Sequence, residues 1–334
     1  MVLGWMRDGS GWAMRCGRLA GTLTACVVVM ALGAAPAAFA SQPLGHGPPG
    51  GRGGGGGTAV TAFAGNDVSW PQCGKVLPSA PAFGIVGING GLANDLSACF
   101  GPSSSYPSYT QSELYWAVSR STSTTSEPKA SLYVNTADPG NIYNGKPIAD
   151  WPTSGSTPAY GTCTTTTVSS RGKTYTVGTN SPACAWVYGY DKATQDLRWL
   201  TAAAQAISAQ ESTFVVPATA SSYPWWLDIE TGNTWQSGSA GVAMNVADLQ
   251  GVVAALHGAG VSVGAVGVYS TSSQWGQIAG TTTASSGSLF GLPDWVPGAT
   301  TESGAVANCA LSSFTGGSIQ LAQWTGTFDN DHVC

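Results

Sequence analysis

Two acidic residues close an apolar segment in the middle of the chain. The segment reads Trp225-Trp226-Leu227-Asp228-Ile229-Glu230, which predicts a strand over residues 225–230. Side chains two positions apart in a strand face the same side, so Asp228 and Glu230 project together and Trp226 joins them. Two close carboxyls separate in pKa, and one keeps a proton that it can donate as a general acid. The spacing therefore indicates acid–base hydrolysis, with a structural pair held by loop amides and an arginine as the alternative.

Aromatic residues lie at or just beyond the ends of several expected strands. They are Trp70, Trp226, Trp235, Tyr269, Trp275, Trp295 and Trp324. Sugar rings stack on flat aromatic faces, so this placement suits a cleft for a polysaccharide. The alternative is that most of these rings belong to the core, where aromatic side chains dominate packing.

The elements that must position these residues alternate along the chain. Strands are expected over residues 66–70, 83–89, 131–135, 225–230, 261–270, 294–296 and 319–324, and helices over 111–119, 191–209, 245–259 and 272–278. Alternation of apolar strands with helices implies parallel pairing covered by helices. We expect an α/β fold, a single (β/α) TIM-like barrel whose site lies at the carboxyl ends of the strands. Residues 100–112, 138–183 and 280–292 are expected to be long loops.

The N-terminus has the pattern of an export signal. Three arginines precede a run of apolar and small residues, and Ala38-Phe39-Ala40 forms a cleavage site. The expected organisation is a signal peptide over 1–40, a Gly/Pro-rich flexible linker over 41–61, and one barrel domain over 62–334. No later stretch is expected to approach the roughly 20 apolar residues that a membrane span needs. We therefore expect a secreted monomer, extracellular or associated with the cell wall, without stable membrane insertion.

Six cysteines remain after the expected leader is removed. They are Cys73, Cys99, Cys163, Cys184, Cys309 and Cys334. An even number in an oxidising compartment favours three disulfides. Sequence leaves about 15 pairings open, and pairing of neighbours is the simplest expectation. A zinc site is disfavoured because the chain has no C-x-x-C and only three histidines.

Charge and motifs disfavour several classes of protein. The chain has a net charge of −5, which argues against a nucleic-acid partner. Residues 260–264 match G-x-S-x-G, but they lead from a helix into a strand, the reverse of a nucleophile elbow. Neither an H-E-x-x-H motif nor a cluster of histidines is present. We expect no metal and no organic cofactor.

The order of several short motifs resembles the glycoside hydrolase family 25 lysozymes. Residues 65–72 are similar to the opening G-x-D-V-S-x-x-Q strand of that family, and residues 83–88 to its next buried strand. Residues 227–230 are similar to its L-D-x-E strand, 267–269 to its G-V-Y strand, and 323–324 to its late Q-W strand with an aspartate after it. The resemblance implies an irregular barrel that cleaves peptidoglycan or a related β-1,4 amino-sugar glycan.

Carried over to this chain, the resemblance implies roles for particular residues. Glu230 would be the general acid, Asp228 its charge partner or a stabiliser of the transition state, and Asp67 would position substrate or water. Either Asp329 or Asp331 would hold the far side of the site. Substrate contacts are expected from the aromatic residues Trp70, Trp226, Tyr269, Trp295 and Trp324, and from Gln323.

Several outcomes remain open at the level of sequence. The acid-bearing segment that the family carries after its second strand is Ile88-Asn89-Gly90-Gly91 here. This departure favours the alternative function, a non-catalytic glycan- or cell-wall-binding protein on the same barrel. A structural secreted protein that uses only the scaffold is a third class. The mechanism could be retaining, inverting or assisted by the substrate's acetamido group.

Overall fold

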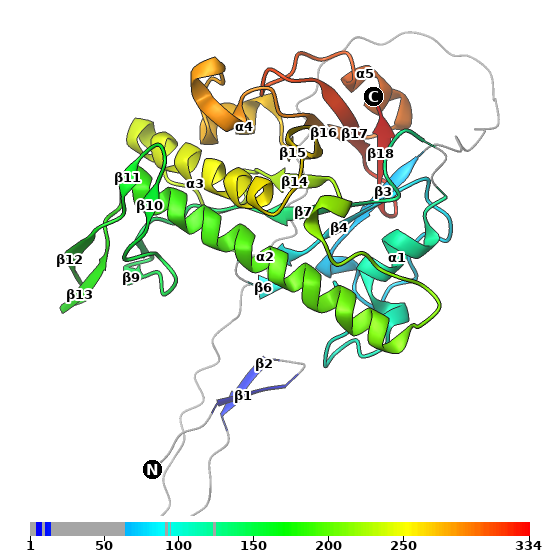
Figure 1. The fold of residues 1–334 in the computed structure, drawn as a ribbon, viewed down its shortest axis with the longest axis horizontal. Coiled ribbons are helices and arrows are strands. Elements are labelled where there is room, and N and C mark those ends of the chain that lie inside the picture. Colours follow the sequence, from blue (N-terminus) through cyan, green and yellow to red (C-terminus); the bar gives the residue numbers. More distant parts are fainter. Residues whose placement is uncertain (1–4, 9–10, 15–63, 91–92, 94, 123–124) are drawn as a thin grey trace, which may run out of the picture. The chain divides into compact units, whose positions relative to one another are not determined.

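A computed structural model describes residues 5–8, 11–14, 64–90, 93, 95–122 and 125–334 of the chain (Figure 1). The chain divides into two units, Met1–Gly51 and Arg52–Cys334. In the first unit, β1 (Trp5–Asp8) pairs antiparallel with β2 (Gly11–Met14). The remainder of the expected signal peptide and the whole expected linker lie outside the described residues.

The second unit is a mixed α/β structure built around a closed barrel of eight strands. Their order around the barrel is β14-β15-β16-β17-β18-β3-β4-β7. The strands are β3 (Gly65–Val68), β4 (Gly84–Gly87), β7 (Ala130–Asn135), β14 (Trp225–Asp228), β15 (Val266–Tyr269), β16 (Asp294–Ala299), β17 (Ile319–Trp324) and β18 (Asp329–Val333). The first seven correspond to the seven expected strands. These seven strands pair parallel with one another wherever they are neighbours, as expected. The eighth strand, β18, was not predicted, and it runs antiparallel to both of its neighbours, β17 and β3.

Five α-helices each lie between two barrel strands along the chain. They are α1 (Glu113–Arg120), α2 (Pro182–Gln210), α3 (Gly238–Gly258), α4 (Ser272–Ile278) and α5 (Glu302–Asn308). The sequence predicted the first four but placed the starts of α2 and α3 too late. Ser181 fixes the start of α2, because its side chain accepts a hydrogen bond from the backbone N–H of Cys184 and a proline opens the first turn.

Helices α2 and α3 pack side by side against the barrel (Figure 1). A Cβ on Gly189 would lie 2.1 Å from the carbonyl oxygen of Asp248, and one on Gly251 would lie 2.0 Å from that of Trp186. Only glycine permits this close approach of the two backbones.

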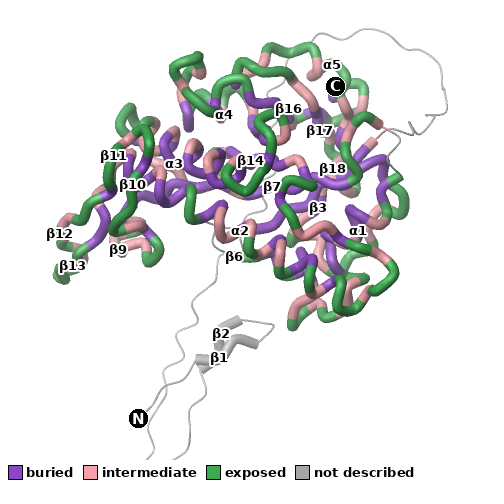
Figure 2. Tube along the Cα trace, in the orientation of Figure 1, coloured by how far each residue is buried: buried purple, intermediate pink, exposed green. Residues whose placement is uncertain are grey.

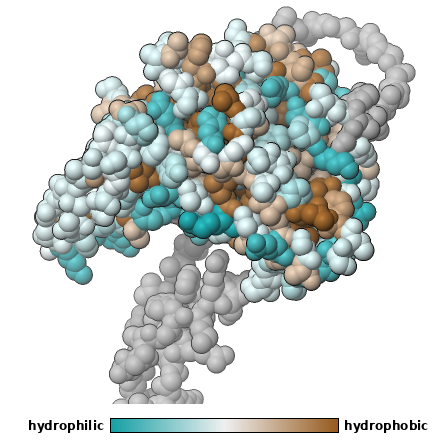
Figure 3. All heavy atoms as spheres, viewed as in Figure 1, coloured by the Kyte–Doolittle hydropathy of each residue, from teal (hydrophilic) through white to brown (hydrophobic). Residues whose placement is uncertain are grey.

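By length and composition alone, α3 is long and apolar enough to span a membrane. The expectation that no later stretch would approach this length was therefore wrong. More than half of the most apolar window of α3 is buried inside the unit, which accounts for this composition without a membrane. On the face seen in Figure 3, apolar side chains form separate patches between polar ones.

Large side chains fill the inside of the barrel. Phe83, Ile85, Trp226, Trp295 and Leu321 form one buried cluster there, with Tyr133 and Tyr269 packed against it. The barrel strands supply glycines opposite these rings, since an added Cβ on Gly267 would lie 2.3 Å from the Trp226 ring. A larger cluster lies between the strands and the helices, so the strands are buried on both faces (Figure 2).

Residues 138–183 are not the single long loop that the sequence suggested. They hold β8 (Ile142–Tyr143), β9 (Lys146–Pro147), β10 (Ser156–Thr157), β11 (Gly161–Thr162), β12 (Thr165–Ser170) and β13 (Lys173–Gly178), paired as three hairpins, and then the first residues of α2. A small cluster around Trp151, Cys184 and Tyr188 joins this insertion to α2.

The remaining short elements lie in connections. They are β5 (Asn89–Gly90), β6 (Asp95–Leu96) and the 3₁₀-helices η1 (Trp70–Gln72), η2 (Tyr109–Gln111), η3 (Ala220–Ser222), η4 (Val263–Ala265) and η5 (Ala284–Leu289). The expected strand over 261–270 is therefore shorter, because η4 occupies its first half.

Three disulfides join neighbouring cysteines in the sequence. The pairs are Cys73–Cys99, Cys163–Cys184 and Cys309–Cys334. Pairing of neighbours is thereby confirmed. Disulfides of this number are consistent with an extracellular protein.

Candidate active site

A pocket of about 200 Å³ opens at the carboxyl ends of the parallel barrel strands. We call it the site pocket. It is lined by Asp67, Ser69, Pro71, Gln72, Tyr133, Asp228, Glu230, Tyr269, Trp295, Gln323 and Asp329. The two acidic residues of the central strand thus meet acidic residues from the first and the last barrel strands.

Asp228 and Glu230 hold different positions in this pocket. Asp228 is the last residue of β14 and is buried, with no hydrogen-bond partner for its Oδ1 among the described residues. Glu230 lies two residues beyond the strand and is half-buried. Burial raises the pKa of both carboxyls, and the charge of Glu230 raises that of Asp228 further.

Side-chain donors hold the backbone around this pair. Thr136 Oγ1 donates to the carbonyl oxygen of Asp228 at 2.7 Å, and Ser270 Oγ donates to that of Ile229, also at 2.7 Å. The indole N–H of Trp235 donates to the carbonyl oxygen of Glu230 at 2.9 Å. Three side-chain hydrogen bonds therefore hold the backbone of residues 228–230 in place.

A hydrogen-bonded chain crosses the pocket to Asp67 on β3. The Tyr269 hydroxyl donates to Gln323 Oε1 at 3.0 Å, and Gln323 Nε2 donates to Asp67 Oδ2 at 2.9 Å. Burial and then the charge of Asp329 raise the pKa of Asp67 to about 7, although the Gln323 bond lowers it. The Asp67 carboxyl therefore keeps its proton to a higher pH than an ordinary aspartate does.

The two C-terminal aspartates take separate places. Asp329 lines the pocket and is the register partner of Asp67 across the β18–β3 pair. Asp331 is fully buried beneath the pocket, where the indole N–H of Trp295 donates to its Oδ1 at 2.9 Å. Burial and then the charge of Asp67 raise the pKa of Asp331 well above its ordinary value.

Some of the aromatic residues expected to contact substrate line the pocket, and others do not. Tyr269 and Trp295 line the pocket, as does Gln323. Trp226 faces the same side as Asp228 but is only 2% exposed, lies in the barrel interior, and does not line the pocket. Trp324 packs against the outer cluster of Ala299 and Ala305 and does not line it either.

Trp70 lies beside the pocket on η1, between two residues that belong to the site or its edge. Its neighbours Ser69 and Pro71 line the pocket, whereas Trp70 itself is 61% exposed. An exposed ring at this place is available to a ligand that extends beyond the pocket.

Sequence reasoning missed four residues of the pocket wall, namely Ser69, Pro71, Gln72 and Tyr133. Tyr133 alternates with the outward-facing Leu132 and Val134 on β7. Alternation along residues 131–135 was therefore a usable signal for an inward tyrosine.

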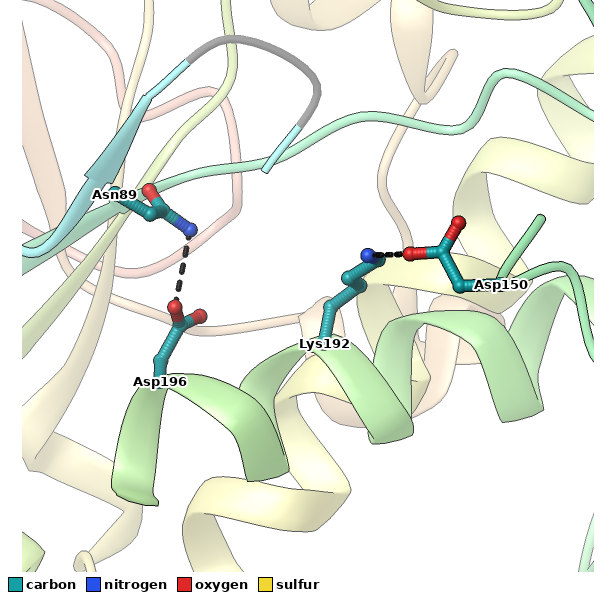
Figure 4. Close-up of polar contacts among 4 residues, drawn as sticks. All are labelled: Asn89, Asp150, Lys192 and Asp196. Atoms are coloured by element: carbon teal, nitrogen blue, oxygen red, sulfur yellow. Dashed lines mark hydrogen bonds and ion pairs between the residues drawn. The ribbon is translucent and has the colours of Figure 1, made fainter. Parts of the chain in front are cut away.

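A second polar cluster anchors the rim of the barrel to α2 (Figure 4). Asn89 Nδ2 donates to Asp196 Oδ1 at 3.1 Å, and Asn89 Oδ1 accepts the backbone N–H of Asn135 at 2.7 Å. One turn earlier on α2, Lys192 forms an ion pair with Asp150. Asn89 thus links two barrel strands to a helix.

Among the described residues, one group of side chains is close enough together to share a metal ion, namely Cys73, Cys99 and Glu113. The two cysteines are joined in a disulfide, so only the carboxyl could serve as an anionic ligand.

Comparison of the chain with protein-family models, with curated proteins and with solved structures gave no match.

Proposed function

We propose that the chain is an exported glycoside hydrolase that cleaves a β-1,4-linked amino-sugar polymer, foremost peptidoglycan. The observation that carries this proposal is the meeting of Asp67, Asp228, Glu230 and Asp329 in one pocket beside Tyr269 and Trp295. Paired carboxyls are the usual machinery of glycoside hydrolysis, and aromatic rings bind sugar faces.

Glu230 is the general acid in this proposal. It is the more accessible member of the central pair, and burial raises its pKa, so it retains a proton for the leaving oxygen. Asp228 is the charge partner of Glu230, because repulsion between the two close carboxylates keeps a proton on the pair. Asp67, oriented by Gln323, positions substrate or water.

We extend the proposal to the fold and to export. The segments that resemble family 25 lysozymes all lie in one closed barrel, on β3, β4, β14, β15 and β17, with Asp329 on β18. This agreement supports an irregular (β/α) barrel of that kind. Three disulfides support export through the expected signal peptide, because such bonds form in oxidising compartments.

Release of reducing ends tests the proposal. The full chain is purified from the medium and incubated with purified peptidoglycan and with chitin, beside Glu230→Gln and the control Glu211→Gln, which lies outside the pocket. We expect release by the wild type and the control, and a loss of at least about a hundredfold in Glu230→Gln. Binding to peptidoglycan without release by any of the three would instead identify a glycan-binding protein.

A further inference from the structure

A second cavity, of about 380 Å³, adjoins the site pocket. It lies between residues 72–79, which follow β3, and the side chains of η2 and α1. We call it the lateral groove. Gln72 lines both the groove and the site pocket, so the two cavities are adjacent at this side chain.

The groove carries two positive charges without acidic partners. Lys75 and Arg120 line it from opposite walls, and both are exposed. In the part of the chain that the structure describes, the ion pair formed is that of Lys192 with Asp150, so neither groove cation pairs with a carboxylate there. Unpaired cations facing one cavity attract an anionic group, and arginine binds carboxylates with two parallel hydrogen bonds.

Glu113 forms part of the groove wall and does not cancel these charges. It is the first residue of α1, is only 1% exposed, and neither of its carboxyl oxygens has a hydrogen-bond partner among the described residues. Burial raises its pKa to about 8, so the group is neutral at pH 7. Because this carboxyl is neutral, the two cations leave the field of the groove positive.

We propose that the lateral groove binds the carboxylate-bearing peptide stem of peptidoglycan while the sugar backbone occupies the site pocket. This inference rests on the proposed function, and it makes the groove the feature that selects a stem-bearing glycan over a neutral one such as chitin. The groove would bind an anionic group, and the phosphates of wall polymers are anionic like the carboxylates of the peptide stem.

Two substrates and two charge-matched double variants test the groove. The substrates are peptidoglycan freed of phosphate polymers by hydrofluoric acid, with its stems intact, and the same glycan after an amidase has removed the stems. The variants are Lys75→Gln with Arg120→Gln, and the control Lys146→Gln with Lys173→Gln, which removes two exposed charges from the 138–183 insertion.

We expect the groove variant to raise KM roughly tenfold on the stem-bearing substrate and to leave kcat unchanged. On the stem-free substrate, the groove variant should equal the wild type. The proposal would be overturned if the groove variant and the wild type had equal KM values on the stem-bearing substrate. It would also be overturned if the control variant showed the same rise in KM.

Sedimentation with insoluble peptidoglycan separates this proposal from the proposed function. In an inactive Glu230→Gln background, the groove variant should bind the phosphate-free wall more weakly than the control, with a smaller dependence on salt. If the wild type releases no reducing ends but this difference persists, the hydrolase proposal fails and the groove stands. Binding that disappears when phosphate polymers are removed would overturn the stem assignment.

Discussion

Replacing Glu113 by glutamine should make the folded protein less sensitive to rising pH. Burial raises the pKa of Glu113 from 4.5 to about 8, so the folded chain binds this proton more tightly than the unfolded chain. The stability gained from the proton is complete below pH 4.5 and is lost as pH rises through about 8. Because each pH unit in this interval is worth about 1.4 kcal/mol, the wild type should lose about 3 kcal/mol through this group between pH 5 and pH 7, and about 4 kcal/mol by pH 8.5.

Glutamine keeps the size of the side chain and removes the titration. We would measure unfolding in guanidinium chloride by tryptophan fluorescence at pH 5, 7 and 8.5, with the disulfides intact. The free energy of unfolding of Glu113→Gln relative to the wild type should rise by about 3 kcal/mol from pH 5 to pH 7. Glu211→Gln, at an acid whose pKa is lowered by its hydrogen bonds with Thr213, should show no such rise. A difference between Glu113→Gln and the wild type that does not change with pH would refute the reasoning.

Three further predictions concern the site, a disulfide and the barrel interior. Because burial raises the pKa of Glu230, kcat/KM for glycan cleavage should fall as pH rises along a limb centred above 4.5, and a limb at or below 4.5 would exclude Glu230 as the acid. Replacing Cys309 and Cys334 by serine opens a link with a sequence separation of 25 and should cost about 3 kcal/mol in urea unfolding, whereas a loss under about 1 kcal/mol would contradict it. Gly267→Ala should destabilise by about 1–3 kcal/mol in the same assay, because its Cβ would lie 2.3 Å from an indole ring, while Gly276→Ala on α4, where no atom lies within 4 Å, should not.

The sequence was sufficient to predict the strands that alternate with helices, whereas the pairing of neighbouring cysteines was one choice among about 15 that the sequence left open. Apolar runs such as Trp225–Asp228 are visible because parallel strands are buried on both faces. Strand β18 (Asp329–Val333) was missed because four of its five residues are polar, so it has no apolar run. The hairpins of residues 138–178 were missed for a related reason, since several have strands of two residues each.

The candidate site was predictable where periodicity decides it. Asp228 and Glu230 face one pocket as a period of two requires. Depth within the barrel was not predictable, because the same period places Trp226 on the side of Asp228 but cannot say that it lies in the interior. The separation of Asp329 from Asp331 likewise depends on the pairing of β18 with β3, which no local pattern encodes.

The ring of strands closes between its earliest and latest members along the chain. Asn66 Nδ2 donates to Asn330 Oδ1 at 3.1 Å, across a separation of 264 residues. Bringing such distant segments together costs loop entropy, so this seam should form late in folding. Until β18 pairs with β3, Asp67 and Asp329 are not held beside each other, and the pocket lacks the side that they form. On the proposed function, a chain exported from its N-terminus would therefore carry the acidic residues of β3 and β14 and still be inert until β18 has paired with β3.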